Sequence, residues 1–183
     1  MASVAYPNVV KTFETSRGFT YNYARSPPSS QASTIVFLHG FPSSAADWSL
    51  QISHLQTHGY GVIAVDQLGY GDSSKPSSPT AYGLPEIAKE MVEILDHESI
   101  AKAHFVGHDA GVAVLSMILS FHAERVISAT MLAVGYMPPG IEFDIKKINQ
   151  MTKQANGWER FGYIEFLSQD ESWELLDQHV RCC

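Results

Sequence analysis

The sequence predicts an α/β fold, in which a mostly parallel β-sheet has helices on both faces. Two observations lead to this prediction. Strand-like runs alternate with helical patterns along most of the chain, which is typical of parallel strands joined by crossover helices. The run Thr34–Leu38 is apolar after its first residue, as expected of a strand that is buried on both faces.

The strands are predicted from alternation and from short apolar runs. The first two strands alternate and are joined by Ser16-Arg17-Gly18, which is a hairpin signal. Residues 69–79 are rich in Gly, Ser and Pro, so a long loop is expected there. The predicted strands are residues 9–15, 19–24, 34–38, 60–65, 103–106 and 126–134.

Helices are predicted where apolar residues recur every three or four positions. Four apolar residues between Ile87 and Leu95 fall on one face of such a helix. Asp47 is a candidate N-cap of the first helix, and Gly59 ends that helix. The predicted helices are residues 48–57, 85–97, 110–121 and 141–156, with one or two more within 158–179.

Composition and charge limit the class of protein. Of 183 residues, 45% are hydrophobic and 17% are charged, as in a folded globular domain. The net charge is −7 and no basic stripe is present, so nucleic acid is not expected as a partner. No apolar run approaches the roughly 20 residues that span a membrane. Residues 1–10 lack the pattern of a signal peptide.

The cysteines and the missing cofactor motifs give two further expectations. Cys182 and Cys183 are the only cysteines and offer no disulfide framework, so a reducing, cytoplasmic location is predicted. No group of His, Cys and carboxylate residues has the spacing of a metal site, and no phosphate loop or dinucleotide fingerprint occurs. We therefore expect no cofactor.

The stretch Gly107-His108-Asp109-Ala110-Gly111 has the pattern of a nucleophile elbow, a sharp turn between a strand and a helix. Small residues flank the nucleophile because the two backbones approach closely, and the nucleophile itself adopts a strained conformation. Asp109 stands where serine is usual, and a carboxylate suits attack on saturated carbon. The alternative is that Asp109 is only the N-cap of the following helix.

A second motif, His39-Gly40-Phe41-Pro42, directly follows a predicted buried strand. A turn there can aim the Phe41 backbone N–H at a developing oxyanion, with the Ala110 N–H as the second donor. His39 is expected to be a hydrogen-bonded turn residue rather than a base. The alternative is a His-Gly turn without a catalytic role.

A third segment, Asp66–Pro76, is expected to form a tight loop at the same sheet edge, where ligands of parallel sheets bind. Together, HGFP at 39–42, LGYGDSSKP at 68–76 and GHDAG at 107–111 resemble the α/β-hydrolase superfamily, and within it the epoxide hydrolases. The resemblance covers nearly the whole chain. It implies the α/β-hydrolase fold, with residues 1–137 as the N-terminal part of the core through the sixth strand and 138–183 as the beginning of a helical lid.

The resemblance also implies roles for individual residues. Asp109 would be the nucleophile, and the backbone N–H groups of Phe41 and Ala110 would form the oxyanion hole. A cis peptide bond is expected before Pro42. The remaining motif residues that support this site are His39, Gly40, Gly107, His108 and Gly111.

The implied reaction opens an epoxide to a diol. Asp109 attacks an epoxide carbon while a lid tyrosine, for which Tyr163 is the candidate, donates to the ring oxygen. A histidine-activated water then hydrolyses the resulting ester. The alternative for Tyr163 is a packing role in an aromatic lid helix. Phe41, Trp48 and the aromatic lid indicate a small lipophilic epoxide or related electrophile. The resemblance to epoxide hydrolases implies a role in detoxification or secondary metabolism.

The chain departs from the family because the acid and the histidine that follow the lid are missing. The eight histidines are residues 39, 54, 58, 97, 104, 108, 122 and 179, and none follows a final strand. His179 and Glu142 are weighed as replacements for the base and the acid. The chain is therefore predicted to be C-terminally truncated and impaired in turnover, with residues 126–134 as an exposed sheet edge that favours self-association.

Two other interpretations stay open. A haloalkane or fluoroacetate dehalogenase would use the same Asp109 ester. Ala110 argues against it, because the family often has tryptophan there to hold the leaving halide. A catalytically inactive truncated homologue, or a binding module, would keep the crevice without turnover.

Overall fold

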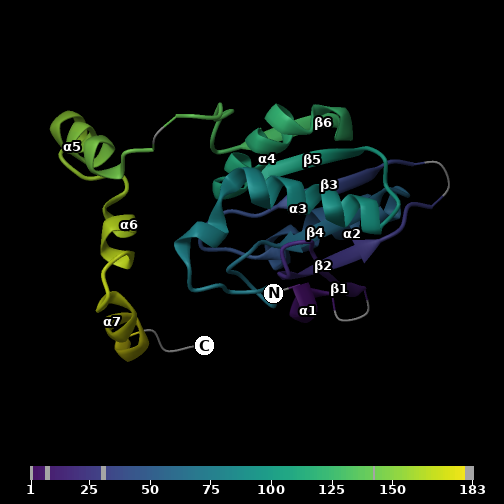
Figure 1. The fold of residues 1–183 in the computed structure, drawn as a ribbon, viewed down its shortest axis with the longest axis horizontal. Coiled ribbons are helices and arrows are strands. Elements are labelled where there is room, and N and C mark those ends of the chain that lie inside the picture. Colours follow the sequence, from purple (N-terminus) through teal and green to yellow (C-terminus); the bar gives the residue numbers. More distant parts are fainter. Residues whose placement is uncertain (1, 7–8, 30–31, 142, 180–183) are drawn as a thin grey trace. The chain divides into compact units, whose positions relative to one another are not determined.

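The computed structural model describes residues 2–6, 9–29, 32–141 and 143–179 (Figure 1). The chain divides into two compact units, Met1–Pro139 and Gly140–Cys183. The assignment of residues 1–137 and 138–183 as core and lid domains stays a prediction. Among the described residues, no helix is long and apolar enough to cross a membrane.

The first unit is built on a six-stranded sheet with the strand order β1-β2-β4-β3-β5-β6. Its strands are β1 (Val10–Glu14), β2 (Thr20–Ser26), β3 (Thr34–Leu38), β4 (Gly61–Asp66), β5 (Ala103–His108) and β6 (Val126–Leu132). The pairs β1–β2 and β2–β4 are antiparallel. The other three pairs are parallel, so the prediction of a mostly parallel sheet is confirmed.

The helices of the first unit follow the predicted order, with short additions. They are α1 (Ala2–Ala5), α2 (Ser49–Thr57), α3 (Leu84–His97) and α4 (Ala110–Phe121), with 3₁₀ turns η1 (Ala45–Trp48), η2 (Pro79–Tyr82) and η3 (Ala123–Arg125). The second unit contains α5 (Ile145–Asn156), α6 (Gly162–Leu167) and α7 (Ser172–His179). The predicted start of α5 at residue 141 is wrong, because Asp144 caps this helix and its side chain accepts from the Lys147 N–H.

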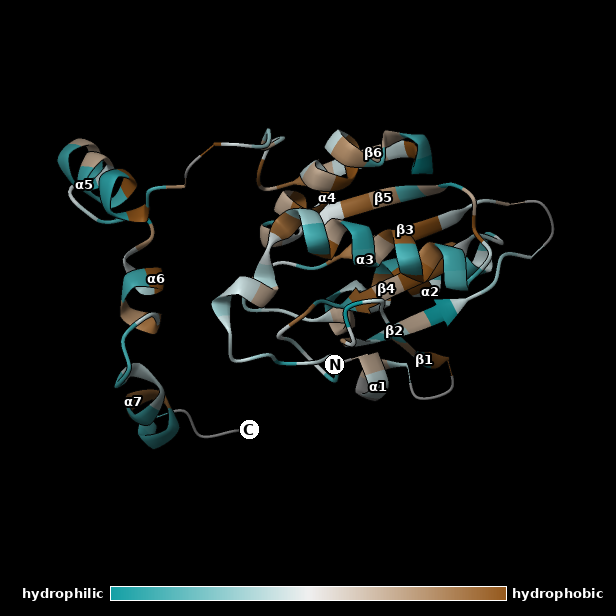
Figure 2. Ribbon diagram, viewed as in Figure 1, coloured by the Kyte–Doolittle hydropathy of each residue, from teal (hydrophilic) through white to brown (hydrophobic). Residues whose placement is uncertain are grey.

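Helices cover both faces of the sheet, and each layer has its own core. On one face, α3 and α4 pack on the strands through a cluster that includes Met91, Leu115 and Phe105. On the other face, η1 and α2 contribute Trp48 and Ile52 to a smaller cluster. Figure 2 shows the central strands β3, β4 and β5 as the most hydrophobic part of the ribbon. Every residue of β4 is buried, as expected of a central strand.

Strand β6 is the last in the strand order, and five of its seven residues are exposed. Ile127 is 48% exposed and Leu132 is 41% exposed. The strand ends two residues earlier than predicted, because Ala133 has a positive φ of 69° that breaks the extended backbone. Self-association through this edge stays a prediction.

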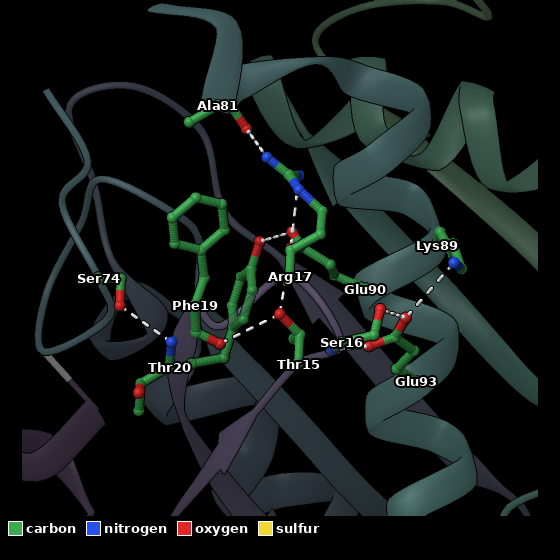
Figure 3. A network of polar contacts seen from close by, with 11 residues as sticks. Thr15, Ser16, Arg17, Phe19, Thr20, Ser74, Ala81, Lys89, Glu90 and Glu93 are labelled. Carbon is green, nitrogen blue, oxygen red and sulfur yellow. Dashed lines mark hydrogen bonds and ion pairs between the residues drawn. The ribbon is translucent and has the colours of Figure 1, made fainter. Parts of the chain in front are cut away.

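The β1–β2 turn is fastened to α3 by the buried side chain of Glu90 (Figure 3). The Glu90 carboxylate accepts from the Tyr21 hydroxyl at 2.6 Å and from the Thr15 hydroxyl at 3.2 Å. The Arg17 Nη1 atom lies 3.4 Å from it. Burial raises the pKa of Glu90, against the opposing effects of Tyr21 and Arg17. Nearer the surface, Glu93 accepts from the Ser16 N–H at 2.8 Å.

Candidate active site

Asp109 joins β5 to α4 in a backbone conformation that non-glycine residues rarely adopt, with φ 49° and ψ −118°. It occupies the N-cap position of α4, but its carboxylate makes no capping hydrogen bond. Instead, Oδ1 accepts from the Phe41 backbone N–H at 3.1 Å. The side chain is half-buried. The N-cap interpretation of Asp109 is therefore wrong, and its carboxylate is turned toward the segment that follows β3.

Glycines allow the close approach of three backbones around Asp109. A Cβ on Gly111 would lie 2.3 Å from the Leu38 carbonyl oxygen, and a Cβ on Gly107 would lie 3.0 Å from the Gly111 carbonyl oxygen. A Cβ on Gly40 would lie 2.6 Å from the Asp109 Cβ. Glycine is required at these positions because the backbones of β3, β5 and α4 come close together at this turn, as the sequence pattern indicates.

Of the two predicted oxyanion donors, Phe41 bonds to the Asp109 carboxylate and Ala110 follows Asp109 in the chain. The peptide bond between Phe41 and Pro42 is cis, as predicted. Phe41 already directs its N–H at the Asp109 carboxylate. Ala110 is the first residue of α4, where a backbone N–H has no acceptor within its own helix. On the β6 side, the Asp109 N–H donates to the Leu132 carbonyl oxygen at 3.1 Å.

His39 is buried, and both of its ring nitrogens are engaged. Nδ1 lies 2.9 Å from the Gly40 carbonyl oxygen, and Nε2 accepts from the Gln67 backbone N–H at 3.0 Å. Burial lowers the pKa of His39, against the opposing effect of the Gly40 carbonyl. A neutral ring donates at Nδ1 and accepts at Nε2, which fits a residue that holds the turn together.

A small cavity of about 210 Å³ opens beside the elbow on the α2 side of the sheet. Its walls are mixed rather than purely apolar: Trp48 and Leu132 lie beside polar side chains that include Asp47 and His108. The Trp48 and His108 rings meet edge-on, with centroids 6.5 Å apart. The lining is therefore less apolar than expected.

Tyr163 lies in α6 of the second unit and is 44% exposed. Its ring meets Phe161 edge to face at 6.3 Å, and Phe161 in turn meets Phe143 at 5.3 Å. An aromatic cluster is thus present in the second unit, which fits both the catalytic and the packing interpretation of Tyr163.

No base or metal site is found among the described residues. None of the eight histidines hydrogen-bonds to Asp109, and the His179 ring lies 2.8 Å from the Leu175 carbonyl oxygen. The part of the chain that the structure describes contains no group of His, Cys, Asp and Glu side chains arranged to hold a metal ion. Glu142, Cys182 and Cys183 lie outside the described residues.

The sequence placed Asp66 at this sheet edge, as the first residue of the third segment, but did not reveal its role there. Asp66 is fully buried at the end of β4, and its carboxylate accepts backbone N–H groups from Ala2, Ala45 and Asp72. The available signal was a carboxylate directly after a fully apolar strand, at the sheet edge where Asp109 also lies. Its partners could not be read from the sequence, because they come from distant segments.

Comparisons with known proteins agree with this geometry. Residues 33–170 match the family model described as alpha/beta hydrolase fold. The chain is 43% identical over 115 residues to bifunctional epoxide hydrolase 2 of Mus musculus, which is 62% of this chain and 21% of that protein. It is 38% identical over 118 residues to epoxide hydrolase B of Mycobacterium tuberculosis, which is 64% of this chain and 33% of that protein.

Solved structures show the same likeness. The crystal structure of epoxide hydrolase A from Mycobacterium thermoresistibile superimposes with a TM-score of 0.75 at 28% identity, over 92% of this chain and 51% of that one. The chain thus spans about half the length of that structure and a third or less of the two curated relatives. Because the family model matches most of the sequence, the chain belongs to the alpha/beta hydrolase fold family, and within it the chain is similar to epoxide hydrolases.

Proposed function

We propose that this chain carries the nucleophile of an epoxide hydrolase and opens an epoxide through an ester on Asp109. One observation carries the proposal: the Asp109 carboxylate lies on a strained turn and bonds to the Phe41 N–H, instead of capping its own helix. Strain of this kind persists where the surrounding structure enforces it, which is common at reactive residues. The epoxide hydrolases among its relatives support the substrate class.

The chemistry follows from the nucleophile. An Asp109 oxygen attacks an epoxide carbon, the bond from that carbon to the ring oxygen breaks, and the oxygen takes a proton from the Tyr163 hydroxyl. The product is a hydroxyalkyl ester of Asp109. Water then adds to the ester carbonyl, and the Phe41 and Ala110 N–H groups stabilise the oxyanion until the diol leaves. The proton that the water gives up passes to solvent, from which the Tyr163 phenolate regains the proton it donated. No metal or redox step is needed for this sequence of bond changes.

The direct test is incubation of the 183-residue chain with an excess of styrene oxide, followed by mass spectrometry of the intact protein and its peptides. We expect one hydroxyalkyl group per chain, attached at Asp109. Because no histidine reaches Asp109 among the described residues, we expect diol release to stay at or below one equivalent per chain. Diol release is followed by chromatography.

The outcomes separate the competing functions. Steady release of many equivalents of diol would show that another group acts as the base. Labelling by haloalkanes with release of halide, without labelling by epoxides, would favour a dehalogenase. The absence of any adduct with either electrophile would contradict the proposal and favour a binding module.

Tyr163→Phe tests the proposed proton donor. Phenylalanine keeps the ring that meets Phe161 and removes only the hydroxyl. We expect the rate of Asp109 labelling to fall by about 10²-fold, the lower end of what a general acid contributes. Tyr60→Phe, at another partly exposed tyrosine, is the matched control and should leave the rate unchanged. An equal rate for Tyr163→Phe and wild type would leave Tyr163 with a packing role only.

A further inference from the structure

The carboxylate of Asp66 gathers three separate segments of the first unit. It is fully buried at the end of β4. Oδ1 accepts from the Ala45 N–H at 2.9 Å, and Oδ2 accepts from the Ala2 N–H at 2.9 Å and the Asp72 N–H at 3.3 Å. These donors lie 21, 64 and 6 residues away along the chain. A buried carboxylate held by backbone N–H groups is a strong, directional anchor.

The loop after β4 is shaped to approach this anchor. Gly71 has a φ of 52°, and a Cβ there would lie 2.1 Å from Asp66 Oδ2. The N-terminal segment donates to the same oxygen through Ala2 and adds a contact from the Tyr6 hydroxyl to the Ala45 carbonyl oxygen at 3.4 Å. Both segments therefore reach Asp66, and the N-terminal segment also reaches Ala45, which begins η1.

The neighbouring residue, Gln67, holds the other end of the same segment. Its backbone N–H donates to His39 Nε2 at 3.0 Å, and its side-chain amide donates to the His39 carbonyl oxygen. The segment 39–45 is thus bonded to residues 66 and 67 at both of its ends. Between those ends lie Phe41 and Pro42, which are both exposed.

We propose that Asp66 and Gln67 are positioning residues that fix segment 39–45 at its two ends and thereby hold the Phe41 N–H against the Asp109 carboxylate. Neither residue touches the reacting atoms. The structural part of this inference stands on the contacts above, and only its catalytic consequence rests on the proposed function. Movement of the segment would turn the Phe41 N–H away from Asp109 Oδ1, which now lies 3.1 Å from it.

Asp66→Asn and Gln67→Met test the two ends separately. Asparagine keeps one acceptor oxygen but replaces the other with a donor, so it cannot accept from both Ala45 and Ala2. Methionine keeps the length of Gln67 and removes its amide. Glu90→Gln is the matched control, because Glu90 is an equally buried carboxylate of the same unit that holds the β1–β2 turn instead.

Two readouts are measured on the whole chain. Amide exchange followed by NMR should become at least about tenfold faster at Phe41 and Ala45 in both test variants, and not in Glu90→Gln. The Phe41 N–H orients the Asp109 carboxylate for attack, so displacement of Phe41 should slow Asp109 labelling by about tenfold. The epoxide concentration at half-saturation should not change.

Unchanged exchange at Phe41 in folded Asp66→Asn and Gln67→Met would overturn the proposal. Equal acceleration in Glu90→Gln would also overturn it, since the effect would then follow general stability. If Asp66→Asn does not fold, Gln67→Met decides alone. If the wild-type chain takes no label from any epoxide, the proposed function fails, while the exchange data still decide whether these residues position Phe41.

Discussion

Asp109→Asn is expected to lower the rate of labelling by an epoxide by a factor on the order of 10⁴ or more, as losses of a catalytic nucleophile do. An amide nitrogen or oxygen is a poor nucleophile toward saturated carbon. Asparagine nevertheless has the shape of aspartate, tolerates a positive φ, and keeps an oxygen that can accept from the Phe41 N–H at the elbow. The fold should therefore survive while the chemistry stops, which mass spectrometry and circular dichroism measure together.

Asp47→Asn is the control for this experiment. Asp47 is an exposed carboxylate that lines the cavity beside the elbow and bonds to the Ser43 hydroxyl. An exposed carboxylate of ordinary reactivity should not compete with a positioned one, so labelling should continue at the wild-type rate. Equal labelling of wild type and Asp109→Asn, or loss of the adduct in Asp47→Asn, would show that the epoxide reacts elsewhere on the chain.

Local sequence signals predicted the parts of the fold that local forces determine. Helix α4 begins at Ala110 and ends at Phe121 as predicted, because it follows the elbow and is apolar apart from Ser116 and Ser120. The elbow itself was recognisable because close backbone approach requires glycine at fixed positions around Asp109. The cis bond before Pro42 came from the family resemblance and not from the residues alone.

The features of the fold that the sequence patterns did not predict depend on contacts between distant segments. Helix α1 has only four residues, too few to form without support, and the Ala2 N–H is held by Asp66. Glu90 lies in an amphipathic helix, whose pattern gives no sign that its side chain is buried. In the structure it is fully buried and bonds to Tyr21 and Thr15. Periodicity assigns a residue to a helix or a strand, but it does not show which distant donors surround a carboxylate.

Gly111→Ala is expected to lower the free energy of unfolding by about 3 kcal/mol, the upper range for overpacking a core. The new methyl group would lie 2.3 Å from the Leu38 carbonyl oxygen and 2.7 Å from the His39 carbonyl oxygen. Both are backbone atoms, so no side-chain rotation relieves the contact. Relief requires α4 to move away from β3, and urea unfolding followed by circular dichroism measures the cost.

Gly135→Ala provides the comparison, since nothing lies within 4 Å of a Cβ there and the residue is exposed. Its free energy of unfolding should stay within about 0.5 kcal/mol of wild type, as for most surface substitutions. Because Asp109 is bonded to Phe41 on one side and begins α4 on the other, any shift of α4 in Gly111→Ala also lengthens the contact to Phe41. The variant should therefore lose labelling rate together with stability. Loss of stability at an unchanged labelling rate would show that the elbow tolerates movement. That result would contradict the proposal that close packing holds Asp109 in position to react.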